Sequence, residues 1–294
     1  TMRIAAHRNL VGWNMPARLS RTEREQLEEL VETSIQRIID MPRWRGRYVS
    51  LTPGHPKEIK INEYEQLVAD GHMFKSQEND REMKAGRLAE DWPHGRGCYI
   101  SADERTTIWV GTEDHVIIKS GSRSETDADA LLDRLRVTIG LLSDGRGIAF
   151  RHDAEHCGYV TSSPKRAGTG LVASAILALR KLTIDGTAAR IHQIIKSDGL
   201  HVKVMPADDR IHNAWDDLTD DVAGELTSTL GVKFAGDVEE VGDGDTVEIE
   251  VNRTYGVTEA EVACSLFLAT LVLRSAERDE RVAGAALGTG TIGR

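Results

Sequence analysis

Residues 106–119 read TTIWVGTEDHVIIK. Threonine, isoleucine, valine and tryptophan, which favour strands, fill both ends of this stretch, and a short polar break at 111–114 separates them. The pattern predicts two paired strands, at 106–110 and 115–119, with acidic residues at their junction. Because a turn between paired strands is rigid, these acidic groups are expected to face a cleft.

Capping signals and periodicity predict helices around this hairpin. Ser20 and Glu23 form a capping box, followed by apolar residues at helical spacing as far as Ile39. The other predicted helices are 126–142, 171–182, 188–197, 219–230 and 258–278. Further strands are predicted at 148–150 and 159–161, as a hairpin, and at 200–205 and 246–251.

This mixture of helices with strands that need no crossover predicts an α+β fold, an antiparallel sheet surrounded by helices. The predicted helix at 171–182 would place Gly168-Thr169-Gly170 at a helix N-terminus, where an anion can bind. Residues 283–294 are small and Gly-rich, which predicts a mobile tail.

Composition bounds the class of protein. The chain has 294 residues, 40% of them hydrophobic and 29% charged, which is enough for a substantial core. The net charge of −10 and the scattered basic residues disfavour nucleic acid as a partner. The sequence has no apolar run long enough to span a bilayer, so a soluble protein is expected.

The three cysteines favour a reducing compartment, either the cytoplasm or an organelle interior, because they are widely spaced and odd in number. His152-Asp153-Ala154-Glu155-His156 fits the H-x-x-E-H pattern of some zinc peptidases, which need both histidines on one helical face. Gly158 and the flanking strands predict a hairpin there instead. We therefore assign no residue to a metal.

Two separated segments resemble a known family. The first reads DWPHGRG at 91–97 and continues to WVGTEDH at 109–115, and the second reads GYVTSSPKRAGTGL at 158–171. Together they are similar to the phosphagen (ATP:guanidino) kinases, which include creatine and arginine kinases and bacterial protein-arginine kinases. The similarity runs from about Arg3 to Arg278. It implies an antiparallel sheet surrounded by helices, and ATP with Mg²⁺ as cofactors of any active form.

The resemblance also implies site residues. It places Glu113 on the carboxylate that holds the substrate guanidinium and Asp208 on a second substrate carboxylate. Nucleotide-binding roles fall on four residues: Arg3, His72, Arg96 and Lys203. The assignment of Lys203 has an alternative, because the segment 230–233, which ends in Lys233, could take the place in the family pattern assigned to 200–203.

Several positions depart from the family pattern. Ala5 and Val172 replace phosphate-binding arginines, and Lys203 replaces a third, which it cannot match as a planar fork. Thr112 replaces an acidic residue, and Ser163 replaces the reactive cysteine. Ile176 replaces a histidine. Lys165 and Arg166, in the same loop as Ser163, are possible replacement cations.

Two hypotheses follow for a catalytic-domain-like unit at 1–282 and a tail at 283–294. The first is a degenerate kinase domain with a structural or regulatory role in an assembly. The second is an active ATP-dependent guanidino phosphotransferase like the arginine and creatine kinases, with protein arginine as one candidate substrate. The family-atypical segment at about 210–240, with Trp215 as an anchor, is expected either to contact a protein partner or to cover a sheet edge.

Overall fold

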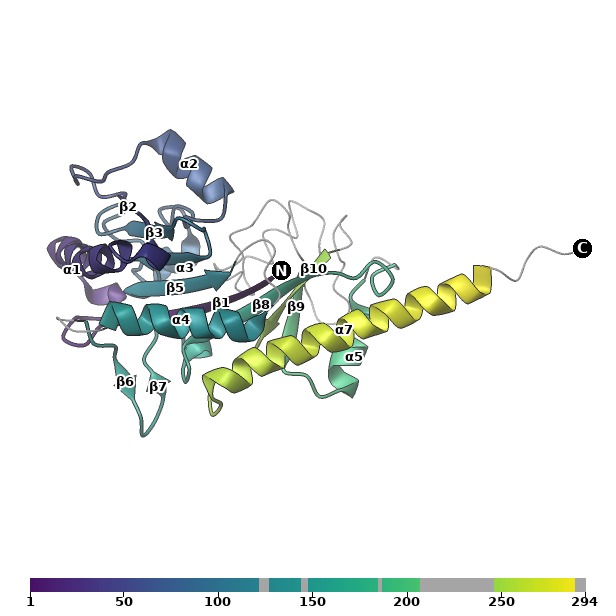
Figure 1. The fold of residues 1–294 in the computed structure, drawn as a ribbon. Helices are drawn as coiled ribbons and strands as arrows, with labels where there is room; N and C mark the ends of the chain where they lie inside the picture. The colour runs from purple at the N-terminus through teal and green to yellow at the C-terminus, as the bar shows by residue number, and fades with distance from the viewer. Residues whose placement is uncertain (122–126, 144–147, 185–186, 207–245, 289–294) are drawn as a thin grey trace, which may run out of the picture.

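A computed structural model describes residues 1–121, 127–143, 148–184, 187–206 and 246–288 (Figure 1). Several sequence predictions concern residues outside these ranges. They are the helix at 219–230, the segment 210–240 with Trp215, and the substrate carboxylate Asp208.

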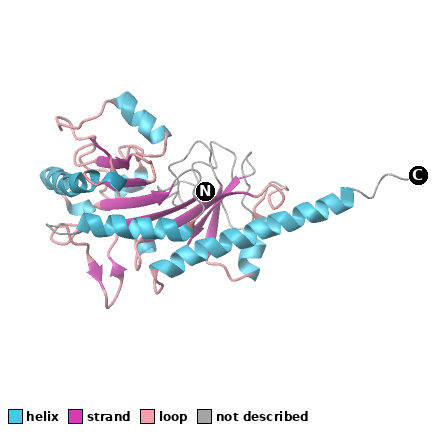
Figure 2. Cartoon of the chain, viewed as in Figure 1, coloured by secondary structure: helices cyan, strands magenta, loops and turns pink. Residues whose placement is uncertain are grey.

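Eight strands form one twisted sheet, in the order β2-β3-β4-β5-β1-β8-β10-β9, and every neighbouring pair is antiparallel (Figure 2). The predicted α+β class with an antiparallel sheet is therefore confirmed. The strands are β1 (Met2–Arg8), β2 (Gly46–Ser50), β3 (Gly97–Ser101), β4 (Thr106–Val110), β5 (Val116–Gly121), β8 (Leu171–Ala178), β9 (Val202–Pro206) and β10 (Thr246–Val251).

The described helices lie mainly along one face of this sheet. They are α1 (Arg21–Ile39), α2 (Ile61–Ala69), α3 (Arg81–Ala85), α4 (Ala128–Ser143), α5 (Ala189–Ser197) and α7 (Glu259–Gly288). Three single turns of 3₁₀ helix, Pro16–Arg18, Pro42–Trp44 and Pro164–Arg166, are η1, η2 and η3. Contacts join α4 to β1 and β5, α7 to β8 and β10, and α1 to β2, so these helices cover one sheet face (Figure 1).

The alternation of strand side chains divides the core into two clusters. Even-numbered residues of β1, such as Ile4, pack against the layer formed by α1, α4 and α7. Odd-numbered residues, such as Ala5, face the other side, where a smaller cluster includes Trp109, Phe74 and Val172. This second face carries the candidate site.

The capping box that predicts α1 is present. The backbone N of Ser20 donates to Oε2 of Glu23 at 2.8 Å, and the backbone N of Glu23 lies 3.4 Å from Oγ of Ser20. Leu27, Val31 and Ile35 are buried against the sheet, as their helical spacing predicts.

The prediction of a helix at 171–182 is wrong. Residues 171–178 form β8, which lies between β1 and β10 and is buried along most of its length. Alanine and leucine favour a helix locally, but a strand buried on both faces also reads as a continuous apolar run, and tertiary pairing decided the outcome. Gly168–Gly170 consequently leads into a strand, and the anion site expected at a helix N-terminus does not form there.

Two other boundaries differ from the predictions. The hairpin is shorter than expected, with β6 (His152–Asp153) paired to β7 (Gly158–Tyr159), and Phe150 bridges Leu10 instead. His152 and His156 therefore lie on a strand and a turn, not on one helical face. The final helix, α7, continues to Gly288 rather than ending near Arg278, and residues 289–294 lie outside the described ranges.

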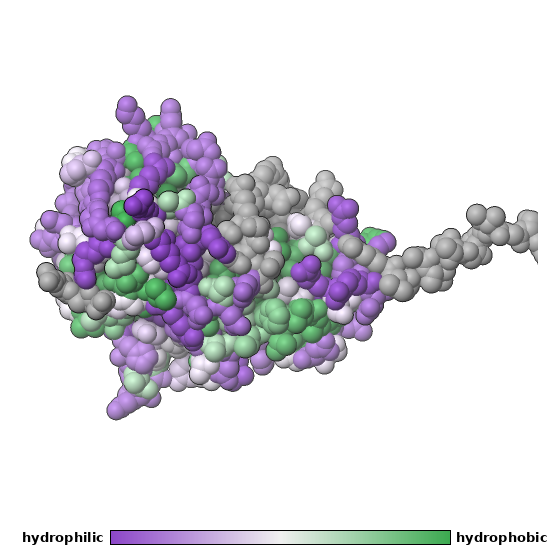
Figure 3. Space-filling model, viewed as in Figure 1, coloured by the Kyte–Doolittle hydropathy of each residue, from purple (hydrophilic) through white to green (hydrophobic). Residues whose placement is uncertain are grey.

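The exposed side of α7 carries apolar side chains. Phe267, Leu268 and Leu271 are between 42% and 54% exposed, and Figure 3 shows a hydrophobic area over this part of the molecule. None of the described helices is both long and apolar enough to cross a bilayer.

Candidate active site

The end of β1 meets the turn between β4 and β5, which brings His7 against Glu113 and Asp114. We call these three residues the acidic nest. A ring nitrogen of His7 and a carboxylate oxygen of each acidic residue all lie within 4.8 Å of one another. The acidic residues predicted at the junction of the two strands thus lie together in the β4–β5 turn, and β1 supplies His7 as the third residue of the nest.

Asp114 forms the buried base of the nest. Its carboxylate accepts hydrogen bonds from Nδ2 of Asn9 at 2.6 Å and from the backbone N of Ser162 at 2.7 Å, and Oδ2 lies 3.0 Å from Nδ1 of His7. Burial alone would raise the pKa of Asp114, but His7 and these donors lower it to about 2. A negative charge is therefore held inside the fold.

The mouth of the nest holds a guanidinium from the chain itself. Arg166, on η3, forms an ion pair with Glu113, and the two side chains are 5% and 12% exposed. Nη1 of Arg166 also lies 3.0 Å from Nδ1 of His7. The histidine and two carboxylates are a donor set that a divalent cation could use, and Arg166 lies in that place.

His115, next in sequence to the nest, has a structural position. Its Nδ1 accepts from the backbone N of Leu10 at 2.9 Å, and Nε2 lies 2.8 Å from the carbonyl oxygen of Asn14, so the ring donates there. Burial lowers the pKa of His115 to about 4. The folded protein therefore keeps this ring neutral at pH values at which an exposed histidine is charged.

This shift predicts acid sensitivity. Between the unfolded pKa of about 6.5 and the folded pKa of about 4, the unfolded chain binds a proton that the folded chain does not. Stability is thus present above pH 6.5 and is lost as the pH falls. We expect His115 to contribute a loss of about 3 kcal/mol in unfolding free energy between pH 7 and pH 4.

Urea denaturation of the wild type and of His115→Gln at both pH values measures this loss. Burial raises the pKa of Glu28 and Glu248, which favours the fold at low pH. Both proteins share this effect, so the difference between their pH dependences gives the contribution of His115. Equal pH dependence in both proteins would contradict the assignment.

A row of four polar residues, three of them charged, crosses four strands on the same sheet face. Backbone pairing aligns Arg3 of β1 with Ser174 of β8, Ser174 with Glu250 of β10, and Glu250 with Lys203 of β9. We call these four residues the mixed row. Nζ of Lys203 lies 3.1 Å from Oε1 of Glu250. Two of the predicted phosphate-binding cations, Arg3 and Lys203, are thus brought into one row.

Glu248 lies beside the mixed row. It is two residues from Glu250 on the same strand and therefore on the same face. Burial raises the pKa of Glu248, while Ser174, Arg3 and Lys203 act to lower it. The face thus carries two carboxylates among its cations.

Arg96 lies away from this row, and its guanidinium hydrogen-bonds to backbone carbonyls. Nη1 donates to the carbonyl of His94 at 2.6 Å, and Nη2 donates to those of Leu88 and Glu90 at 2.7 and 3.0 Å. The side chain is fully buried, and burial together with Arg24 lowers its pKa to about 9. The nucleotide role of Arg96 stays a prediction.

His72 lies after α2, near the β2–β3 edge of the sheet. Its Nε2 is 3.5 Å from Oε2 of Glu104, and its carbonyl accepts from Nε1 of Trp109 at 2.7 Å. Here a pocket of about 510 Å³ is lined by His72, Arg45, Arg47, Asp70, Ser101 and Glu104, among others. The structure therefore does not bring His72 and Arg96 into the mixed row.

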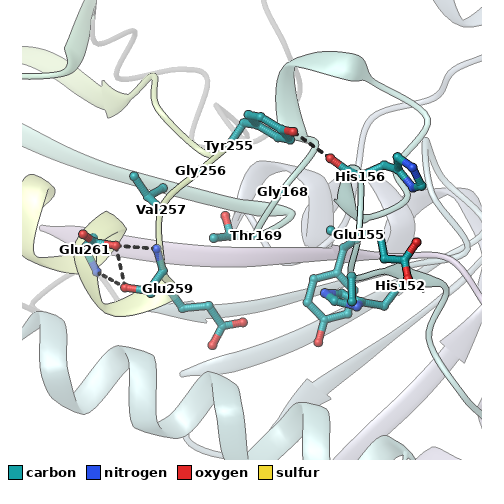
Figure 4. Close-up of a pocket in the computed structure, with 14 residues that line it drawn as sticks. His152, Glu155, His156, Gly168, Thr169, Tyr255, Gly256, Val257, Glu259 and Glu261 are labelled. Atoms are coloured by element: carbon teal, nitrogen blue, oxygen red, sulfur yellow. Dashed lines mark hydrogen bonds between the residues drawn. The ribbon is translucent and has the colours of Figure 1, made fainter.

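A second pocket, of about 690 Å³, lies between the β6–β7 hairpin and the start of α7 (Figure 4). Glu155, Glu259 and Glu261 line it together with His152 and aromatic residues. Glu261 accepts from the backbone N of Thr258 at 2.6 Å, in the predicted capping box. The guanidinium of Arg8 stacks 3.5 Å from the ring centroid of Tyr159 and lies 3.3 Å from Glu259.

Sequence reasoning missed Glu248, Glu250 and the part played by His7. Glu248 and Glu250 alternate with apolar residues in TVEIEV, so period-2 reading places both on one face, and this signal was available. No sequence pattern indicated that Arg166 would pair with Glu113, since this contact depends on the path of the loop that carries Arg166.

The fold and this site together define the class of protein. Residues 26–216 match the model of the ATP:guanido phosphotransferase C-terminal catalytic domain. The chain belongs to this family.

Particular relatives span several members of the family. The chain is 28% identical over 256 residues to the flagellar creatine kinase of Strongylocentrotus purpuratus. The aligned region covers 85% of this chain and 20% of that protein. It is 30% identical over 173 residues to the arginine kinase of Anthopleura japonica, covering 58% of this chain and 22% of that protein. The chain thus spans only about a fifth of these two relatives.

Solved structures share the fold. A lombricine kinase has a TM-score of 0.74 at 19% identity, over 96% of this chain and 66% of that one. The substrate-free duplicated taurocyamine kinase of Schistosoma mansoni has a TM-score of 0.70 at 22% identity, over 95% of this chain and 32% of that one.

Proposed function

We propose that this chain is a guanidino-kinase catalytic domain with impaired phosphotransfer, which serves a structural or regulatory role in a protein assembly. The observation that carries the proposal is the charge pattern of the site face. Glu248 and Glu250 lie among the cations Arg3 and Lys203, and Lys203 is paired with one of them.

A triphosphate fits this face poorly. Phosphoryl transfer needs an excess of positive charge around the phosphates, with Mg²⁺ bridging them. In and beside the mixed row the cations Arg3 and Lys203 are offset by the carboxylates Glu248 and Glu250, and bringing a phosphate there adds charge repulsion in a partly buried environment. The described residues of this face therefore do not fit Mg-ATP.

The apolar replacements support the same conclusion. Ala5 and Val172, at positions where the resemblance expects phosphate-binding arginines, are buried in the cluster around Trp109. Their side chains contribute to packing, so a cation at either position would have to displace part of the core.

Calorimetric titration with Mg-ATP at physiological salt tests the proposal. We expect the wild type to show no low-micromolar binding. We expect Glu248→Gln with Glu250→Gln to bind at least about tenfold more tightly, because repulsion is removed. Glu63→Gln, on exposed α2, is the matched control and is expected to leave the titration unchanged.

The alternative is an active ATP-dependent kinase for a guanidinium, with protein arginine as one candidate substrate. It is favoured by the alignment of Arg3 with Lys203 in one row and by a nest that already holds a guanidinium. Low-micromolar Mg-ATP binding, together with a phosphoarginine product that Glu113→Gln abolishes, would establish this alternative and overturn the first proposal.

Contact with another protein is part of the proposal. It is assigned to residues 210–240, with Trp215 as an anchor, and to the tail, on the grounds that a catalytic fold does not require them.

A further inference from the structure

The acidic nest has the composition of a guanidinium receptor. Glu113 offers a carboxylate at the mouth, and Asp114 places a second carboxylate behind it, buried and hydrogen-bonded to Asn9 and Ser162. His7 lies between them, with Nδ1 3.0 Å from both Oδ2 of Asp114 and Nη1 of Arg166. A planar cation with several N–H donors matches such a site better than a compact ammonium does.

The occupant of the nest comes from a loop that is held in place independently. The hydroxyl of Thr254 donates to the carbonyls of Lys165 and Ala167 at 3.0 Å each. The backbone N of Gly168 donates to the carbonyl of Cys157 at 2.8 Å. These backbone contacts flank Arg166 on both sides and do not involve its side chain, so the loop has anchors that remain when the side chain is removed.

We propose that Arg166 is a resident ligand of the acidic nest, so that a guanidinium from solution reaches Glu113, where the family resemblance places the substrate guanidinium, only by displacing this side chain. The inference goes beyond the proposed function and concerns the site at which its alternative, the active kinase, places a guanidinium. A tethered side chain acts at an effective concentration on the order of millimolar or higher, so a soluble competitor is at a constant disadvantage. Arg166 thereby limits the access of soluble guanidinium compounds to Glu113.

Chemical rescue tests the inference without any nucleotide. Arg166→Ala leaves Glu113 largely buried without this partner, so the melting temperature is expected to fall. Methylguanidinium, at concentrations too low to denature, is expected to fill the space and raise the melting temperature of the variant by about 3 °C or more. N-methylurea has nearly the same shape without the charge and is expected to give no such rise.

Two further proteins make the experiment specific. In Arg166→Ala with Glu113→Gln, the rise caused by methylguanidinium is expected to disappear. Arg151→Ala is the matched control, because Arg151 donates through Nη2 to the carbonyl of Trp13, at 2.7 Å, and no rescue is expected there. An equal effect of methylguanidinium and N-methylurea on Arg166→Ala, or a rise that survives Glu113→Gln, would overturn the inference.

Arg166→Lys provides a second route if the alanine variant does not fold. Lysine keeps the charge but not the fork, so it should compete less well. Methylguanidinium is then expected to shift the amide resonances of Gly111 and Ser162 in Arg166→Lys but not in the variant that also carries Glu113→Gln. Unshifted resonances in both would overturn the inference. Since the readout involves no ATP, its failure is distinct from a failure of the proposed function.

Discussion

Asp114→Ala is expected to lower the free energy of unfolding by about 3–5 kcal/mol. The carboxylate is fully buried and receives hydrogen bonds from Asn9 and Ser162, and it lies against His7. Its removal would take the side-chain acceptor from the backbone N of Ser162, would leave Asn9 with the carbonyl of Val160, and would place less negative charge near Arg166. Urea denaturation at pH 7 measures the change.

Two variants separate the contributions to this effect. Asp114→Asn keeps the shape but loses the charge, and we expect it to cost about half as much as alanine. Asp153→Ala is a matched control, because Asp153 also contacts two backbone N–H groups and a histidine, but in an exposed turn. If Asp153→Ala destabilises the protein as much as Asp114→Ala, burial does not explain the effect.

Arg96→Ala is expected to cost about 3–5 kcal/mol of unfolding free energy, whether or not nucleotide is present. Its guanidinium holds three backbone carbonyls of the 88–94 loop, and each loses a charged donor in the variant. Melting curves with and without Mg-ATP measure the effect on the fold and on binding separately.

Lys203→Ala provides the comparison for Arg96→Ala. Lys203 is partly exposed in its pair with Glu250, so its loss should cost less than about 1 kcal/mol. An Arg96→Ala protein that melts like the wild type but has lost affinity for Mg-ATP would instead establish the phosphate-binding role that the sequence predicts.

The fold was predictable wherever a local signal agreed with the tertiary structure. The Ser20 capping box predicts α1, and the β-branched runs around residues 111–114 predict β4 and β5 with their acidic turn. The failure at β8 has a physical cause. Its residues favour a helix when isolated, and the strand forms because β1 and β10 pair with it from distant parts of the chain.

The candidate site was predictable in its residues but less so in their partners. Sequence motifs select Glu113, Arg3 and Lys203, and the structure places the last two in one row. The contacts of Arg96 with the 88–94 loop and of Arg166 with the nest depend on loop paths that no periodicity encodes. Side-chain identity therefore indicated where charge is concentrated, and the fold determined how that charge is paired.

The central position of β1 constrains the order in which the molecule can assemble. Arg3 pairs with Gly121 on one side and with Ser174 on the other, so β1 joins partners more than a hundred residues further along the sequence. Closing such long loops is entropically costly and slows folding. During synthesis β1 can therefore form its native pairs only after β5 and then β8 emerge, and a strand that waits for its partners is a site of mispairing.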